Sequence, residues 1–317
     1  MREFTIDRQS AGKRLDRWLA AAAPSLPAGL MQKYLRLKRV KLNGRPAARD
    51  ARLNEGDSVQ LYIENEFFAR PKTADPFYSR ICPKLDILYE DDHLMLVDKR
   101  PGLIPHPDAS EKVNTLITHV QAYLYQKGQW DPSDRSAFAP TLCNRIDRFT
   151  GGIEIVARTE EAMRVLSRKI RDREIEKRYL CIVHGRVAPP SGVLDSYLAK
   201  NTRRVTVTDA PAPGAQRALT RYATLETARG LSLMECELLT GRTHQIRAQF
   251  AHIHHPLLGD SQYGDPKQNE RYHRSFQALY AYRLAFRFTT DAGPLNALNG
   301  RVFQVRDVPF VREYFPD

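Results

Sequence analysis

The sequence is poor in cysteine and in long apolar runs. Its four cysteines never occur at Cys-x-x-Cys spacing, so it predicts neither a paired zinc or redox motif nor a disulfide framework. No segment approaches the roughly 18 apolar residues of a membrane-spanning helix. The first residues carry charges where a secretion signal needs an apolar core. These absences favour a protein of the reducing cytoplasm without a membrane partner.

Several common nucleotide-binding and hydrolase motifs are also missing. The chain has no Gly-x-x-x-x-Gly-Lys-Ser/Thr phosphate loop and no Gly-x-Gly-x-x-Gly fingerprint. It has no His-Glu-x-x-His metalloprotease motif and no Gly-x-Ser-x-Gly elbow. We therefore expect chemistry that needs neither a nucleoside triphosphate nor a nicotinamide.

Positive charge is abundant. The 317 residues include 49 Lys and Arg against 37 Asp and Glu, for a formal net charge of +12. Hydrophobic residues make up 42% and charged residues 27%, so the chain is globular and long enough for about two domains. An excess of this size favours a polyanionic partner, and a nucleic acid is the main candidate.

The amino-terminal part predicts a small α/β RNA-binding domain over residues 1–66. Apolar spacing predicts helices over 14–23 and 29–37, and alternation predicts strands over 40–45 and 59–63. Residues 31–49 hold seven basic residues and no acidic one. We expect this cationic stripe to contact RNA phosphates, against the simpler possibility of a solvated helix face.

A proline-containing segment over 67–83 reads as a linker, and a second domain follows over 84–317. Strands are predicted over 86–89, 94–99, 153–157, 179–183, 218–226 and 231–239, with more strands in 277–306. Helices are predicted over 113–125, 160–171 and 244–252. Strands interspersed with helices, rather than strictly alternating with them, indicate an α+β domain with a mixed or antiparallel sheet.

Three segments could carry chemistry. In residues 144–152, Asp147 lies between Arg145 and Arg148 just before a strand, which suits an ionised nucleophile or base as well as a turn aspartate. In residues 239–247, Arg247 could pair with an acid from elsewhere or lie on a basic surface helix. Tyr179 could stack on a base, accept a proton or belong to the core.

Two clusters raise the question of a metal. The histidines at 244, 252, 254 and 255 are close in sequence, but they straddle a predicted helix end, and we predict no metal site. Asp91, Asp92 and His93 could serve a metal-dependent nuclease. Adjacent acids at a turn more often only shape the turn.

Taken together, these segments resemble the RluA-type family of RNA pseudouridine synthases. The family pattern His-Arg-Leu-Asp-x-x-Thr-Ser-Gly corresponds to residues 144–152, and Lys-x-Tyr with a later Gly to 177–185. Gly-Arg-Thr-His-Gln-Ile-Arg is present at 241–247, and Gly-His-Pro-x-x-Gly-Asp corresponds to 254–260. The family positions of His, Leu and Ser are occupied here by Asn144, Ile146 and Gly151. The resemblance covers roughly residues 85–309.

The resemblance implies a synthase fold and an enzyme that isomerises uridine without a cofactor. It implies that Asp147 is the catalytic carboxylate, that Tyr179 stacks on the uracil and that Arg247 pairs with Asp147. Arg145 would enter the space left by the target nucleotide. The substrate-binding residues implied are Arg145, Arg242, His244 and Gln245.

Residues 12–63 are similar to the S-four RNA-binding domain, through Arg14-Leu15-Asp16-Arg17-Trp18-Leu19 and the Val40-x-Leu42-Asn43-Gly44 turn. The RNA-binding residues expected there are Arg14, Arg17, Lys33, Arg36, Lys38, Arg39 and Lys41. We expect a monomer acting on ribosomal RNA rather than transfer RNA. The competing hypothesis is a non-catalytic RNA-binding or ribosome-assembly protein that retains the fold.

Overall fold

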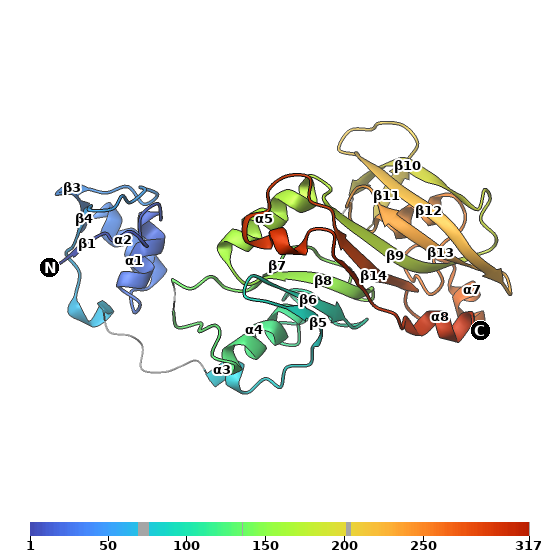
Figure 1. The fold of residues 1–317 in the computed structure, drawn as a ribbon, viewed down its shortest axis with the longest axis horizontal. Coiled ribbons are helices and arrows are strands. Elements are labelled where there is room, and N and C mark those ends of the chain that lie inside the picture. Colours follow the sequence, from blue (N-terminus) through green and yellow to red (C-terminus); the bar gives the residue numbers. More distant parts are fainter. Residues whose placement is uncertain (69–75, 135, 201–203, 317) are drawn as a thin grey trace. The chain divides into compact units, whose positions relative to one another are not determined.

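The computed structural model describes residues 1–317 apart from 69–75, 135, 201–203 and 317. The chain separates into two compact units (Figure 1). One unit combines Met1–Pro83 with Gln121–Ala139, and the other combines Lys84–Val120 with Pro140–Asp317. Part of the expected linker, 69–75, lies outside the described residues. No helix in the described ranges is long and apolar enough to cross a membrane.

The first unit contains a four-stranded antiparallel sheet in the order β1-β4-β2-β3. Its strands are β1 (Arg2–Thr5), β2 (Val40–Leu42), β3 (Arg45–Pro46) and β4 (Ser58–Leu61), and its first helices are α1 (Leu15–Ala22) and α2 (Ala28–Arg36). Both predicted helices are confirmed. Asn43 and Gly44 both have positive φ, as a tight hairpin turn between β2 and β3 requires.

The core of this unit forms where the two helices lie against the sheet. Leu15 and Leu19 of α1 are completely buried together with Val40, Val59 and Leu61 of the strands. A short 3-10 helix, η1 (Asn65–Phe68), follows β4, and its two phenylalanines pack partly against the same core. Helix α3 (Pro76–Ser79) comes after the undescribed segment.

The second unit is built on a large mixed sheet, whose described strands run in the order β11-β10-β12-β13-β9-β14-β8-β6-β5, with β15 on β14 and β7 on β8. The strands are β5 (Asp86–Glu90), β6 (Leu94–Lys99), β7 (Thr141–Leu142), β8 (Gly151–Ala157), β9 (Ile175–His184), β10 (Ser191–Lys200), β11 (Val205–Thr208), β12 (Gln216–Ala228), β13 (Leu231–Leu238), β14 (Leu279–Phe286) and β15 (Val302–Gln304). Strand β14 pairs in parallel with β8, and the other pairings between these described strands are antiparallel. The predicted α+β class with a mixed sheet is confirmed.

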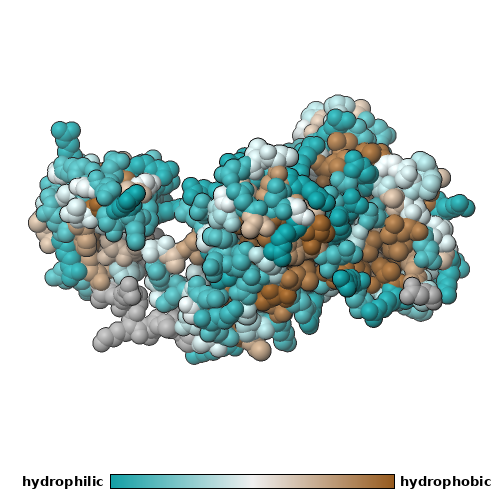
Figure 2. All heavy atoms as spheres, in the orientation of Figure 1, coloured by the Kyte–Doolittle hydropathy of each residue, from teal (hydrophilic) through white to brown (hydrophobic). Residues whose placement is uncertain are grey.

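The helices of the second unit are α5 (Glu160–Arg171), α6 (Gln245–His252), α7 (Pro266–Arg271), η2 (Gly293–Leu298) and α8 (Pro309–Tyr314), and α4 (Leu116–Gln126) is divided between the two units after Val120. Helix α5 follows its sequence pattern closely: Thr159 caps it by accepting from Ala162 N, and Ala162 and Leu166 are buried. The visible surface is mostly hydrophilic, with hydrophobic areas over the second unit (Figure 2).

Two glycines fix how β8 meets β14. A Cβ on Gly152, whose φ is +114°, would collide with the backbone of Ala281, the residue that pairs with it. A Cβ on Gly151 would collide with the ring of Tyr280. The close approach of these strands therefore depends on Gly-Gly at this point, directly after the loop that carries Asp147.

Candidate active site

Asp147 lies in the loop between β7 and β8, and neighbouring groups fix this loop. The side-chain oxygen of Asn144 accepts from Ile155 N at 2.8 Å, which ties the loop to β8. Thr150 N donates to the carbonyl oxygen of Asp147 at 3.0 Å. Asn144, which replaces the family histidine, is therefore a structural anchor, and the change leaves the carboxylate in place.

Beneath the loop lies Lys99, which is completely buried at the end of β6. Its Nζ donates to the carbonyl oxygens of Arg100 at 3.1 Å, Leu103 at 2.9 Å and Arg148 at 3.0 Å. Three N–H groups thus meet three acceptors. Burial lowers the pKa of Lys99. Burial also raises the pKa of Glu154, an equally buried acid on β8. The negative charge of Glu154 acts against the lowering of the lysine pKa.

Arg247 on α6 joins the loop to the rest of the site. Its Nη1 donates to Oδ2 of Asp147 at 2.7 Å. Its Nε and Nη2 donate to Oδ2 and Oδ1 of the fully buried Asp260 at 2.7 and 3.0 Å. The expected contact between Arg247 and Asp147 is present. Asp260 fixes the plane of the guanidinium, so only one edge is directed at Asp147.

The electrostatics of Arg247 and Asp260 favour the ionised forms of both side chains. Burial acts to raise the pKa of Asp260, but hydrogen bonds from Arg247 and from the backbone of Gln262 and Tyr263 outweigh it, and the pKa is lowered. The carboxylates of Asp260 and Asp147 raise the pKa of Arg247 against the effect of its burial. The guanidinium is therefore a permanent cation beside Asp147.

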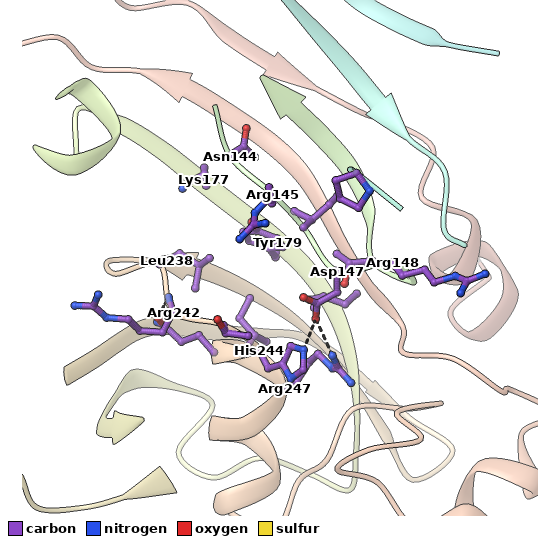
Figure 3. Close-up of a pocket in the computed structure, with 18 of the residues that line it drawn as sticks. Asn144, Arg145, Asp147, Arg148, Lys177, Tyr179, Leu238, Arg242, His244 and Arg247 are labelled. Atoms are coloured by element: carbon purple, nitrogen blue, oxygen red, sulfur yellow. Dashed lines mark hydrogen bonds and ion pairs between the residues drawn. The ribbon is translucent and has the colours of Figure 1, made fainter. Parts of the chain in front are cut away.

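His244, the residue before α6, approaches the same carboxylate oxygen next to Arg247 (Figure 3). Its backbone is left-handed, with φ 53° and ψ 23°, and its Nε2 is 3.7 Å from Oδ2 of Asp147. Its Nδ1 is 3.0 Å from the hydroxyl oxygen of Tyr263, which in turn accepts from Val205 N at 3.0 Å. A chain of contacts thus runs from strand β11 to Asp147.

The surroundings of His244 define its protonation state and its ring tautomer. Burial lowers the pKa of His244, so the imidazole is neutral at pH 7. Because Nε2 faces a carboxylate oxygen, the single ring proton is favoured on Nε2. Nδ1 is then the acceptor of the Tyr263 hydroxyl proton, and His244 presents an N–H dipole to Asp147.

Both neighbours of the carboxylate therefore act on Oδ2. No side chain among the described residues donates to Oδ1 of Asp147. The residue lines a cavity of about 620 Å³, which also contains Tyr179 and Arg145. The Asp147 side chain is 29% exposed, so the free oxygen is accessible.

Tyr179 lies on β9 and is almost completely buried, yet it lines this cavity. Burial raises the pKa of Tyr179, and the negative charges of Glu154 and Asp147 raise it further. The side chain is therefore a neutral phenol in the physiological range. Ile146 from the Asp147 loop packs in the same cluster, so the loop and the strand share one core.

The other predicted substrate residues also line the cavity but differ in what they contact. Arg145 is exposed and forms no ion pair within the described ranges. Arg242 donates from Nε to the Arg217 carbonyl at 3.2 Å and extends away from the Asp147–Arg247 pair (Figure 3). Gln245 is buried, and its amide bonds to Thr240, Thr220, Leu219 O and Arg242 N. Contact of these residues with substrate stays a prediction.

Three residues beside the site had no assigned role from the sequence. Lys99 was only the last residue of the strand predicted over 94–99. Asp260 was only the last residue of the 254–260 motif, and Tyr263 is three residues beyond it. A charged residue inside the apolar β6 run was the one available signal for Lys99. The partners of Asp260 and Tyr263 come from α6 and β11, so no local pattern could reveal them.

The expected RNA-binding residues of the first unit fall into two groups. Lys33, Arg36 and Lys38 are exposed without an ion pair among the described residues, whereas Arg39 pairs with Glu64 at 3.5 Å and Lys41 lies over the Tyr62 ring. Arg14 donates from Nε and Nη2 to Asp16 at 3.1 and 2.9 Å. Arg17 is exposed on α1.

Asp91, the first of the acids considered for a nuclease, shapes a turn. Oδ1 of Asp91 accepts from the backbone N–H groups of His93 and Leu94, both at 2.8 Å, and Oδ2 accepts from the Tyr89 hydroxyl at 2.8 Å. Asp91 therefore closes the β5–β6 hairpin. Among the described residues, no group of three or more His, Cys, Asp or Glu could hold a metal ion.

Comparison with known proteins assigns a family to this geometry. The sequence profile of the RNA pseudouridylate synthase family matches residues 93–252. An uncharacterized RNA pseudouridine synthase of Chlorobaculum parvum is 31% identical over 92% of this chain and 91% of its own length. The ribosomal large subunit pseudouridine synthase D of Xanthomonas campestris is 30% identical over 94% and 88%.

A solved structure supports the fold. Human RNA pseudouridylate synthase domain containing 1 superposes with a TM-score of 0.57 at 20% identity, over 74% of this chain and 87% of that one. The profile match spans half of the chain, and the relatives extend over nearly all of it. The protein is an enzyme that acts on RNA, and the chain belongs to the RNA pseudouridylate synthase family.

Proposed function

We propose that this enzyme converts specific uridines of structured ribosomal RNA to pseudouridine with Asp147 as the catalytic carboxylate. The observation that carries the proposal is how that carboxylate is held: Arg247 donates to Oδ2, no described side chain donates to Oδ1, and the residue lines the cavity. The preference for ribosomal RNA is supported by relatives named ribosomal large subunit pseudouridine synthase D. A non-catalytic role has no comparable support.

The reaction breaks the bond between C1′ of the ribose and N1 of uracil and then joins C1′ to C5. Two routes use the same carboxylate. In one, Oδ1 of Asp147 attacks C1′ as uracil leaves; in the other, the carboxylate takes a proton from C2′ and a glycal forms. Either route needs an ionised Asp147, whose Oδ2 lies 2.7 Å from Nη1 of the Arg247 cation and 3.7 Å from Nε2 of His244.

Tyr179 acts on the base. As a neutral phenol in the cavity, it can stack on the detached uracil while the ring turns to present C5. When C1′ has bonded to C5, the proton on C5 must leave, and Tyr179 belongs to the groups near enough to assist. Arg145 would occupy the place of the extruded nucleotide and offset part of the lost stacking.

The first unit would supply affinity. We propose that residues 1–66 form an RNA-binding domain joined through 67–83 to a catalytic domain over 84–317. Lys33 and Arg36 on α2 would contact phosphates, so replacing both with Gln should reduce the salt slope of binding by about 1.4 to 1.8 log units per log unit of salt. Arg164→Gln with Arg171→Gln on α5 is the matched control. An unchanged salt slope in the Lys33/Arg36 variant would show that these two residues do not contact RNA phosphates.

Tritium release tests the function. Large-subunit ribosomal RNA and transfer RNA, each labelled at uridine C5 and taken from cells that lack the protein, are incubated with the enzyme. We expect release from ribosomal RNA, and mapping of pseudouridine should find a uridine that is unmodified only in those cells. Release of tritium from transfer RNA alone would show that transfer RNA, and not ribosomal RNA, is the substrate. We expect the enzyme to act as a cytoplasmic monomer.

A further inference from the structure

An exposed aromatic side chain lies in the same loop as Asp147. Phe149 is 40% exposed, which is unusual for a phenylalanine on a loop so firmly held. Its ring is stacked on Phe276, with centroids 5.6 Å apart and planes inclined by 21°. The two rings form an apolar stack, here called the Phe149 platform, whose Phe149 ring is partly open to solvent, and the residues on either side of Phe149, Arg148 and Thr150, line the cavity.

The platform is rigid. The carbonyl oxygen of Arg148 accepts from Lys99 Nζ at 3.0 Å and from Gly102 N at 2.9 Å, so the backbone next to Phe149 is fixed. On the other side, the Arg274 guanidinium lies 5.1 Å from the Phe276 centroid and pairs with Glu313 at 3.1 Å. A preorganised ring costs little further entropy when a ligand stacks on it.

A cation lies over the exposed ring. The Arg148 guanidinium carbon is 5.4 Å from the Phe149 centroid. Its Nε donates to the carbonyl oxygen of Gly102 at 3.1 Å, and Arg148 forms no ion pair within the described part of the chain. The side chain extends away from the Asp147–Arg247 pair (Figure 3). An exposed aromatic ring beside an arginine without a carboxylate partner matches the way proteins hold single-stranded RNA, by stacking the base and neutralising the phosphate.

We propose that the Phe149 platform binds an unpaired base of the substrate RNA next to the target uridine, with Arg148 at its phosphate. The distance supports an adjacent nucleotide, because two residues of backbone span at most ~7 Å between Asp147 and Phe149. Phe149 would then select RNA in which the neighbour of the target is unstacked. This inference rests on the proposed function, since it takes Asp147 as the reacting group.

The test compares Phe149→Leu, which keeps apolar bulk but removes the ring, with Phe149→Tyr, which keeps the ring. Loss of one stacked base should raise KM for labelled ribosomal RNA roughly 5- to 150-fold in Phe149→Leu, with a smaller change in kcat. Phe149→Tyr should recover most of that affinity. Leu225→Ala, at a 55% exposed position on β12, is the control for loss of surface apolar area.

Thermal unfolding and oligomeric state are measured for every variant. An unchanged KM in Phe149→Leu, or a fall in Tm that accounts for the lost activity, would show that Phe149 only packs on Phe276. A change of oligomeric state would mark the platform as a protein contact. Either result overturns the proposal.

A binding measurement separates this inference from the proposed function. A single-stranded RNA carrying 2-aminopurine beside a uridine should lose fluorescence on the wild-type protein and much less on Phe149→Leu. If the wild-type enzyme releases no tritium, the proposed function fails, while quenching that depends on the Phe149 ring would still support the platform. Equal quenching by both proteins would refute it.

Discussion

The guanidinium of Arg247 donates to the carboxylate of Asp147 at 2.7 Å although one hundred positions of sequence separate the two residues. The same guanidinium is fixed on its other edge by Asp260. Asp147 is thus held by a cation that cannot turn away, and a single oxygen atom is left for chemistry.

Asp147→Asn should keep RNA binding and reduce turnover by roughly 10³-fold or more, because the amide preserves shape but removes the ionised oxygen. Tritium release and a parallel binding titration measure the two effects. Arg247→Ala should lose most activity as well, and the double variant should be no worse than Asp147→Asn, since the residues act as a unit. Comparable turnover by Asp147→Asn would rule out the mechanism.

Asp260→Asn should destabilise the fold by up to about 3 kcal/mol, because it removes the buried counter-charge of Arg247 and leaves only the partly exposed Asp147 carboxylate beside that cation. Activity should fall even in the fraction that remains folded, as Arg247 is free to rotate. Denaturant unfolding gives the stability, and kcat is corrected for folded protein. A variant as stable as the wild type would mean that Asp260 does not balance the charge of Arg247.

Tyr263→Phe should lower kcat about five- to tenfold, the value of one hydrogen bond of ~1–1.5 kcal/mol, and leave KM unchanged. The substitution removes the proton donor of His244 Nδ1 and so its preferred ring tautomer. In a His244→Asn background it should have no further effect. Tyr314→Phe, whose hydroxyl donates to Tyr272 O at 2.9 Å, is the matched control. An effect on KM alone would argue for substrate contact instead.

Glu174 should make the thermal stability of the protein depend on pH in the acid range. Hydrogen bonds from Lys169 and Thr289 lower the pKa of Glu174 from its usual 4.5 to about 2. A lowered pKa in the folded state adds stability above pH 4.5 that is lost as the pH falls towards 2. Glu174→Gln should therefore have a lower Tm at pH 7, and the gap should close in acid. Parallel Tm curves for the two proteins would contradict this.

Gly151→Ser restores the residue typical of the family motif, yet it should destabilise this chain by about 1–3 kcal/mol, because the new side chain meets the Tyr280 ring. Tyr280→Leu should relieve the clash in the double variant, although it also removes the hydrogen bond to Asp98. Equilibrium unfolding of the four proteins gives the coupling energy. If the two changes in the free energy of unfolding simply add in the double variant, the side chains at 151 and 280 do not clash.

Local patterns predicted much of the fold. Ala162 and Leu166 are spaced for one face of α5, and the Asn43-Gly44 pair marks its turn. Strand β10 was missed because its buried and exposed residues carry mixed chemistry, with Asp195 and Ser196 inside the strand. The position of β14 between β9 and β8 was also not foreseen, since it depends on the close approach at Gly152.

The residues of the site could be predicted only where they belong to a motif within one continuous segment. Asp147, Tyr179 and Arg247 each stand in a recognisable motif, and the structure brings them to one cavity. The tautomer of His244 depends on Tyr263 and on a backbone N–H from β11, three segments that meet only in the folded chain. The burial of Glu154 was likewise not predictable from its own segment. Its Oε2 is buried without a hydrogen-bond partner among the described residues.

The late strand β14 has a consequence for the timing of activity during protein synthesis. It lies between β8, which follows Asp147, and β9, which carries Tyr179. Until residues up to Phe286 have left the ribosome, the two halves of the sheet have no strand to join them, and Asp147 and Arg247 have no common frame. A nascent chain shorter than this therefore has no assembled site for RNA, and the enzyme becomes competent only once β14 has been made.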